Sequence, residues 1–145
     1  MHRRPLGRGR TLATLAGLAI VIGCILPWWT VGGTPGIPAV SGNGLEHVGI
    51  VVFLCGIVTL ALIALPYAAG DRPLGLDRWL SFALLALVGW VAFAIRIVVL
   101  VGNGAFQFSE PAQVFTNGPG LWVTGAGLVM LARAAYTMSR ESVYR

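Results

Sequence analysis

Arg96 is the residue whose type and position most strongly suggest chemistry. It is the only charged residue between positions 79 and 101, in a stretch that is otherwise apolar or small. A guanidinium near the centre of a bilayer costs at least about 2.5–3.5 kcal/mol, so such a residue is usually paired or faces a cavity. On a helix, Gly89, Ala92 and Phe93 share its face, and small residues permit close helix packing. We therefore expect Arg96 to face other helices rather than lipid.

Glu46 is the expected partner of Arg96, and Glu110 is the alternative. Both acidic residues fall where we expect the outer side of the membrane, near the outer end of the helix that carries Arg96. We predict an Arg96–Glu46 pair with His47 beside it. The pair is either a structural ion pair that fixes the order of the helices or a site for an anionic headgroup or a substrate carboxylate. His47 is either a simple hydrogen-bonding residue or a sensor of external pH, because histidine changes charge near neutral pH.

Other patterns of catalytic or cofactor-binding residues are missing from the sequence. There is no Ser/His/Asp set placed for nucleophilic catalysis, no pair of carboxylates within the apolar stretches and no phosphate-binding loop. The two cysteines, Cys24 and Cys55, form no CxxC motif, and the two histidines are far apart. We therefore expect no cofactor, no metal site, no catalytic activity and no energy-coupled pumping.

Cys24 has two interpretations. The run Val21-Ile22-Gly23-Cys24 fits a relaxed lipobox, in which the cysteine is acylated after the preceding segment is cleaved. However, the next residues are Ile-Leu-Pro-Trp-Trp, whereas a mature lipoprotein normally begins with a polar, flexible segment. The preferred interpretation is that Cys24 is a small packing residue of the first helix. Acylation stays as the alternative.

The composition indicates that lipid surrounds most of the chain. Of the 145 residues, 57% are hydrophobic and 10% are charged, whereas a soluble domain carries about 25% charged residues. The length allows one domain and no separate water-soluble one. The net charge of +5 comes from arginines at the ends of apolar stretches rather than on one surface, so we expect no nucleic-acid binding.

Four apolar stretches are long enough to cross the bilayer, since about 20 helical residues span about 30 Å of hydrocarbon. The predicted spans are 11–31, 45–69, 79–101 and 118–136, within a membrane domain of residues 11–138. A basic tail, 1–10, precedes this domain, and a tail of residues 139–145 follows it. Residues 32–44 are rich in glycine and proline, and we expect them to form an outer loop. Trp28 and Trp29 suit the aromatic belt at the membrane surface.

Arginine placement predicts the orientation. Nine of the ten arginines precede the first span, lie between the second and third spans, or lie at the end of the fourth, and the predicted outer loops contain none. The positive-inside rule then places both termini in the cytoplasm of a multi-pass plasma-membrane protein.

The expected fold is all-α, an integral membrane four-helix antiparallel bundle. A Gly-Leu-x-x-x-Gly motif starts at Gly44 and again at Gly120, which raises the hypothesis of a duplicated helical hairpin. Small residues in the predicted spans permit close approach of helix backbones. The candidate helix-packing positions are Ala13, Gly17, Gly23, Gly89, Gly120 and Gly127.

Small size, small-residue strips and the absence of catalytic patterns favour a non-catalytic accessory or scaffold subunit of a larger membrane complex. The alternative is a small oligomeric transporter or lipid-binding protein with Arg96 at its site. We expect membrane lipids and either a protein partner or further copies of the chain as its neighbours. A polar cavity at the midplane would favour transport, and a solid apolar core would favour the accessory role.

Overall fold

The computed structural model describes residues 7–33, 35–68, 78–105 and 116–143, which form four long helices and a two-stranded hairpin. The helices are α1 (Arg8–Ile25), α2 (Gly49–Ala68), α3 (Arg78–Gly102) and α5 (Pro119–Val143), and the strands are β1 (Pro27–Val31) and β2 (Val40–Asn43). All four helices are long and apolar enough to cross a membrane. The chain is therefore mainly helical, as predicted, and its helices are consistent with a multi-pass membrane protein.

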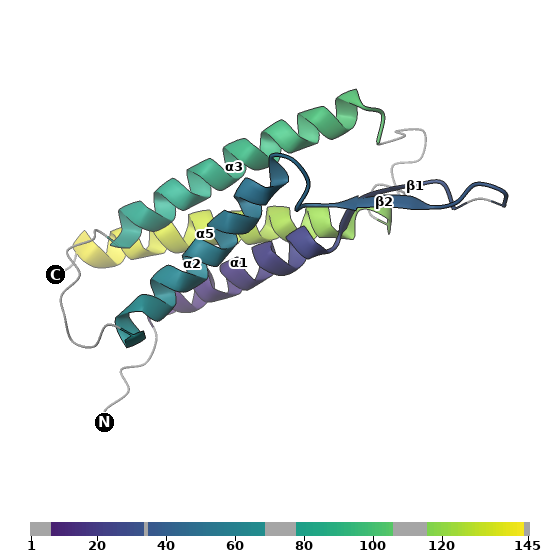
Figure 1. Ribbon diagram of the computed structural model, residues 1–145. Coiled ribbons are helices and arrows are strands. Elements are labelled where there is room, and N and C mark those ends of the chain that lie inside the picture. Colours follow the sequence, from purple (N-terminus) through teal and green to yellow (C-terminus); the bar gives the residue numbers. More distant parts are fainter. Residues whose placement is uncertain (1–6, 34, 69–77, 106–115, 144–145) are drawn as a thin grey trace.

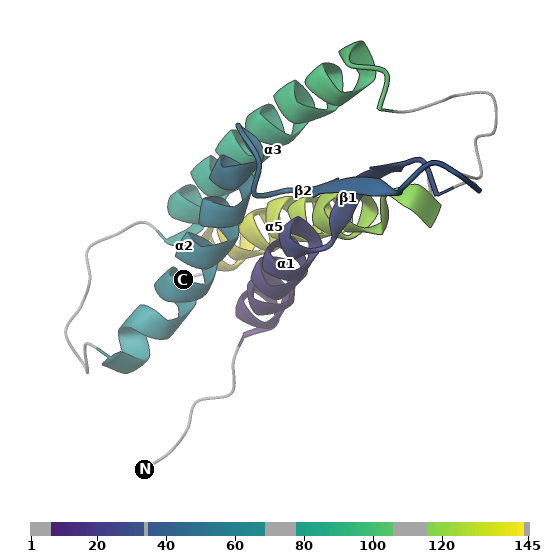
Figure 2. The same ribbon diagram turned by 45° about the vertical axis from the view of Figure 1, so that its right-hand side comes forward.

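The four helices pack side by side and are called the helical body below. α1 packs against α2 and α5, and α3 packs against the same two helices on the other side. The hairpin projects beyond one end of the helical body, which we call the hairpin end (Figures 1 and 2). α1 begins and α5 ends at the opposite end, which we call the terminal end (Figure 1).

The contact between α1 and α5 is the most extensive of the helix pairs. Small residues make it possible, because a Cβ added to Gly9 would lie 2.7 Å from the Met138 side chain and one added to Gly23 would lie 2.6 Å from the Thr124 amide nitrogen. The beginning of α1 therefore lies against the end of α5, and the end of α1 lies against the beginning of α5. Alanine and glycine at such positions allow two backbones to approach closely.

The prediction that the first helix continues to residue 31 is wrong, because α1 ends at Ile25. Leu26 is extended, with φ −67° and ψ 155°. Pro27 explains this ending, since a proline ring disfavours the helical conformation of the residue before it and cannot donate a backbone hydrogen bond. The next residues form strand β1 instead of a last helical turn.

The predicted outer loop, 32–44, contains the second strand of a β-hairpin. β1 and β2 are antiparallel, with Val31 opposite Val40 and Trp29 opposite Gly42. Gly32 and Gly33 follow β1 with φ values of 90° and 84°, a conformation that glycine adopts without steric cost. The expected all-α fold is thus mostly correct, but it lacks this sheet.

Trp28 is buried at the base of the hairpin and does not face outward, as a side chain of the aromatic belt would. Its side chain is 0% exposed and packs edge-to-face on Phe93, with ring centroids 5.4 Å apart. Its indole Nε1 donates a hydrogen bond of 2.9 Å to the Gly23 carbonyl, and the Gly44 amide donates one of 2.9 Å to the Cys24 carbonyl. These two carbonyls belong to the last turn of α1, where backbone carbonyl groups have no N–H donor within the helix. The hairpin therefore caps α1.

We expect substitutions of the two adjacent tryptophans to have different effects on the stability of the protein. Trp28→Phe should lower the free energy of unfolding by about 1–3 kcal/mol, because the buried Gly23 carbonyl loses its donor. Trp29→Phe should change it by less than about 1 kcal/mol, since Trp29 Nε1 is buried without a hydrogen-bond partner among the described residues. Thermal unfolding of both variants in detergent measures the difference, and equal losses would refute the capping role of Trp28.

Other boundaries differ from the predicted spans at the ends. α2 begins at Gly49 rather than at 45, and α5 continues to Val143 rather than ending at 136. The two Gly-Leu motifs lie in different settings, because Gly44 precedes a turn before α2 whereas Gly120 lies in the first turn of α5. The motif therefore gives no structural support to a duplicated hairpin.

Candidate functional site at the hairpin end

Helix α3 holds Arg96 on its inward face, as the sequence predicts. Ala92 and Phe93 on that face are 3% and 4% exposed, and the Arg96 side chain is 5% exposed. Arg96 is six residues before the end of α3, which corresponds to about 9 Å along the helix axis. The guanidinium is therefore near the hairpin end and not at the middle of the helical body.

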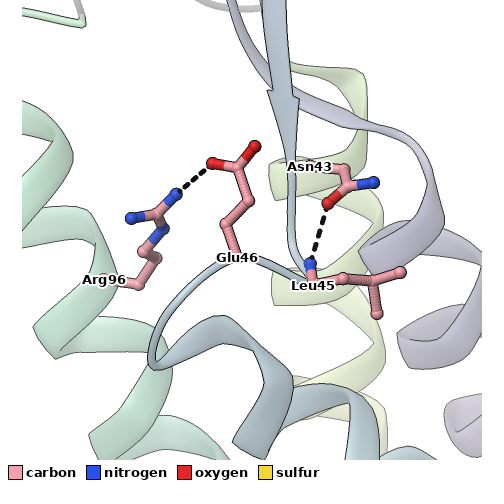
Figure 3. Close-up of polar contacts among 4 residues, drawn as sticks. All are labelled: Asn43, Leu45, Glu46 and Arg96. Carbon is pink, nitrogen blue, oxygen red and sulfur yellow. Dashed lines mark hydrogen bonds and ion pairs between the residues drawn. The ribbon is translucent and has the colours of Figure 1, made fainter.

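Glu46 reaches Arg96 from the turn that precedes α2. Arg96 NH2 donates to Glu46 Oε2 at 2.9 Å, and Figure 3 shows the two side chains extending toward each other from α3 and from this turn. The turn is closed by the Gly49 amide, which donates to the Glu46 carbonyl at 3.0 Å. His47 has a φ of 51°, which is uncommon for a residue other than glycine. The turn is thus a specific conformation that aims Glu46 at α3.

The two charges of the pair differ in their exposure. The Glu46 side chain is 41% exposed, whereas the Arg96 side chain is nearly buried. Water therefore screens the carboxylate more than the guanidinium, and the interaction is weaker than in a fully buried pair. Removing Glu46 would nevertheless leave the Arg96 cation buried without a counter-charge. The pair joins the hairpin–α2 segment to α3.

Gly42 of β2 connects the hairpin to this pair. A Cβ at Gly42 would lie 2.8 Å from Glu46 Oε1 and would overlap Trp29 Nε1 on the opposite strand. Glu46 and the Trp29 indole therefore both lie against the same bare stretch of backbone. In the same way the Trp28 indole lies against Gly44, because a Cβ added to Gly44 would be 2.6 Å from this ring. Glycine is required at both positions because the tryptophans occupy the space of a side chain.

Two buried nitrogens at this end have no partner among the described residues. They are Arg96 Nε and Trp29 Nε1, and both are hydrogen-bond donors. A buried donor without a partner costs free energy, so such groups call for an acceptor such as water or an anionic oxygen. This is the observation that gives the Arg96 site a potential for binding.

The remaining predicted site residues have different outcomes. His47 is exposed beside Glu46, and Glu110 lies outside the described residues. Cys24 and Cys55 are free thiols buried between helices, with Cys24 Sγ 3.9 Å from Thr124 Oγ1. Cys24 is thus placed as a packing residue inside α1. Among the described residues, no group of three or more His, Cys, Asp or Glu side chains is arranged to hold a metal ion.

The six predicted helix-packing residues are all buried in the helical body. Gly17 lies against Leu60 of α2, and Gly89 lies against Leu128 of α5. Gly127 lies against Ile20 of α1, while Gly120 faces the carbonyls of Gly23 and Leu26. Ala13 is 0% exposed. These positions therefore form contacts within one copy of the chain.

The packing of the two tryptophans against Gly42 and Gly44 was not predicted from the sequence. A signal for it was present, since β-branched residues flank a glycine- and proline-rich run, as in Thr30-Val31 before it and Val40 after it.

The fold and site define a mainly helical protein with four candidate membrane-spanning helices, a capping β-hairpin and an Arg–Glu pair at their junction. No family model, curated protein or solved structure matches the chain.

Proposed function

We propose that the protein is a non-catalytic accessory or scaffold subunit of a larger complex in the plasma membrane. In this proposal the helical body is an antiparallel four-helix bundle that crosses the membrane four times. Both termini are cytoplasmic, and the β-hairpin lies on the outer side. The bundle supplies a rigid base, and the hairpin and the helix faces are the surfaces that contact the partner.

Contacts and charges support this arrangement. Gly9 lies near Met138 and Gly23 lies near Thr124, as expected for α1 and α5 in opposite directions. The described arginines other than Arg96 belong to the beginning of α1, the beginning of α3 and the second half of α5, on the side of the terminal end. Arg96, at the hairpin end, is paired with Glu46. This asymmetry is the pattern of the positive-inside rule.

The nature of the interior is the observation that carries the proposal. Among the described residues, the buried polar side chains are Thr59, Arg96 and Thr124. Thr59 donates to the Cys55 carbonyl at 2.7 Å within its own helix, and Thr124 lies beside Cys24. The described interior of the helical body is otherwise filled by apolar side chains such as Ile20 and Leu128, both 0% exposed. An interior of this kind favours a structural role over transport through the bundle.

The hairpin provides the surface on which a partner would dock. Residues 27–45 contain no charged residue, and Val31, Ile37 and Val40 are exposed. A projecting, uncharged element with exposed apolar side chains is typical of an interaction surface. Its base is fixed on the helical body by Trp28, so it presents these side chains in one orientation.

Photo-crosslinking in the native membrane tests the proposal. A photoreactive residue at Ile37, on the hairpin, should give one dominant protein adduct, and the same residue at Leu87, exposed on α3, serves as the control for random collisions. The tagged protein extracted in mild detergent should carry that same partner in a fixed ratio, as measured by mass spectrometry. Adducts that are equal and diffuse at both positions, with no stoichiometric partner, would reject the accessory role.

The second candidate is a small oligomeric transporter or lipid-binding protein with Arg96 at its site. The buried, unpartnered Arg96 Nε favours it, because this donor calls for an acceptor. In the same extraction experiment, this candidate predicts a homo-oligomer that retains lipid or a small anion and no other protein. Loss of the retained molecule in Arg96→Met would assign it to this site.

A further inference from the structure

A regular row of exposed side chains runs along the face of α5 that points away from α1. The residues follow each other at alternating steps of four and three, so they lie on one side of the helix. They are Trp122, Ala126, Val129, Arg133, Tyr136 and Arg140, and all six are exposed. The opposite side of α5 is buried, with Leu128, Leu131 and Ala134 all 0% exposed. The side chains of this row therefore point outward from the helical body.

The row changes in character along the helix. Ala126 and Val129 are apolar and lie in the first half of α5, whereas Arg133, Tyr136 and Arg140 follow in the second half, toward the terminal end. Arg133 and Arg140 are two helical turns apart, which corresponds to about 10.5 Å. The outward face thus joins an apolar strip to a polar group of two guanidiniums and a phenol.

Tyr136 holds Arg140 in place. Arg140 NH2 donates a hydrogen bond to the Tyr136 hydroxyl, and the guanidinium carbon is 5.1 Å from the centroid of the tyrosine ring. The cation–π contact and the hydrogen bond restrict a side chain that is otherwise flexible. Arg140 is therefore oriented before any ligand arrives.

Arg133 is a second exposed cation of the row, and it lies within a candidate membrane span, the stretch Pro119–Arg140. Among the described side chains the only acidic one is that of Glu46, at the hairpin end. An arginine on a lipid-facing surface reaches toward the phosphate layer, because its charge is costly in hydrocarbon.

From this geometry we infer that the outward face of α5 binds a single anionic phospholipid at the terminal end. Arg133 and Arg140 contact the headgroup phosphate and its second anionic or hydroxyl-bearing group, and the Tyr136 hydroxyl borders them. An acyl chain lies along Val129 and Ala126. Two positive charges on the same helix face favour an anionic headgroup over a choline headgroup, whose own cation they repel. The site requires only that the helices cross a membrane, so it is independent of the accessory role.

Titration of lipid into the full-length protein tests the inference. The purified protein in detergent is titrated with short-chain phosphatidylglycerol or phosphatidylcholine, and bound lipid is counted by native mass spectrometry. The wild type should bind one phosphatidylglycerol with preference over phosphatidylcholine. Each arginine removed should weaken binding about fivefold, as expected for one basic side chain near an anionic surface. Arg133→Gln with Arg140→Gln should therefore lose about 25-fold, by the same rule.

The matched control removes two charges from the same end of another helix. Arg8→Gln with Arg10→Gln changes the net charge equally but leaves every residue of the α5 row unchanged, so binding should stay within about twofold of wild type. Equal losses in the two double variants would show a general charge effect and overturn the inference. Equal binding of phosphatidylcholine and phosphatidylglycerol to the wild type would overturn it without any variant. Tyr136→Phe, which keeps the ring, should weaken binding less than either arginine change.

Discussion

Gly127→Ala is expected to destabilise the folded protein by about 1–3 kcal/mol, the cost of adding a methyl group to a packed interface. A Cβ on Gly127 would be 2.8 Å from Ile20 Cγ1, 2.9 Å from the Ile20 amide nitrogen and 3.1 Å from the Ala16 carbonyl. Two of these atoms are backbone atoms of α1, so a side-chain rotation cannot relieve the overlap. The two helices must separate along their most extensive contact.

Gly125→Ala is the control for this prediction. Gly125 is two residues away on α5, and the nearest atom to an added Cβ is Phe93 Cζ at 3.5 Å, an ordinary contact. The gain in helix propensity, up to about 1 kcal/mol, should make this variant neutral or slightly more stable. Thermal or denaturant unfolding in the same detergent compares the two variants. If both have the same midpoint, close packing at Gly127 does not set the stability.

Glu46→Gln is expected to lower the free energy of unfolding by about 1–3 kcal/mol, which is less than the 3–5 kcal/mol typical of breaking a fully buried pair. The substitution keeps the shape of the side chain but leaves the nearly buried Arg96 guanidinium without its counter-charge. The reduction relative to a buried pair follows from the 41% exposure of Glu46, because water screens this end of the interaction.

The double variant Glu46→Gln with Arg96→Met separates a lost interaction from an uncompensated charge. Removing the cation as well should recover most of the stability, since the buried charge is no longer present. Arg133→Gln is the control for loss of an exposed arginine, and its effect on unfolding should be within about 0.5 kcal/mol. A double variant that is less stable than Glu46→Gln alone would show that Arg96 packing, rather than its charge, dominates at this site.

The hairpin links these two regions of the protein. Its base caps α1 through Trp28, and its second strand lies against Glu46 through Gly42. The helix pair that Gly127 holds together and the ion pair that Glu46 forms are therefore joined by one short sheet. A partner that contacts the exposed hairpin residues would act on a segment that is fixed at both points.

Several features of the protein follow from its sequence alone. Predominantly apolar stretches of about 20 residues can satisfy their backbone groups in lipid only as helices, so composition predicts the four helices. Because Arg96 is the only charge in the span 79–101 and few acidic residues are available to neutralise it, the pairing of Arg96 with Glu46 was also predictable. The end of α1 at Ile25 could have been predicted from Pro27, because the effect of a proline on the preceding residue is local.

Only the tertiary structure decided how distant segments meet. The pairing of β1 with β2, the burial of Trp28 under the hairpin and the placing of Trp29 over Gly42 depend on contacts between separate segments, which periodicity does not encode. The outward row on α5 is a second example. Its spacing was visible in the sequence, but the side of α5 that faces away from α1 depends on where the other helices pack. Local rules determine each element, and packing between elements determines which of its faces remains available for binding.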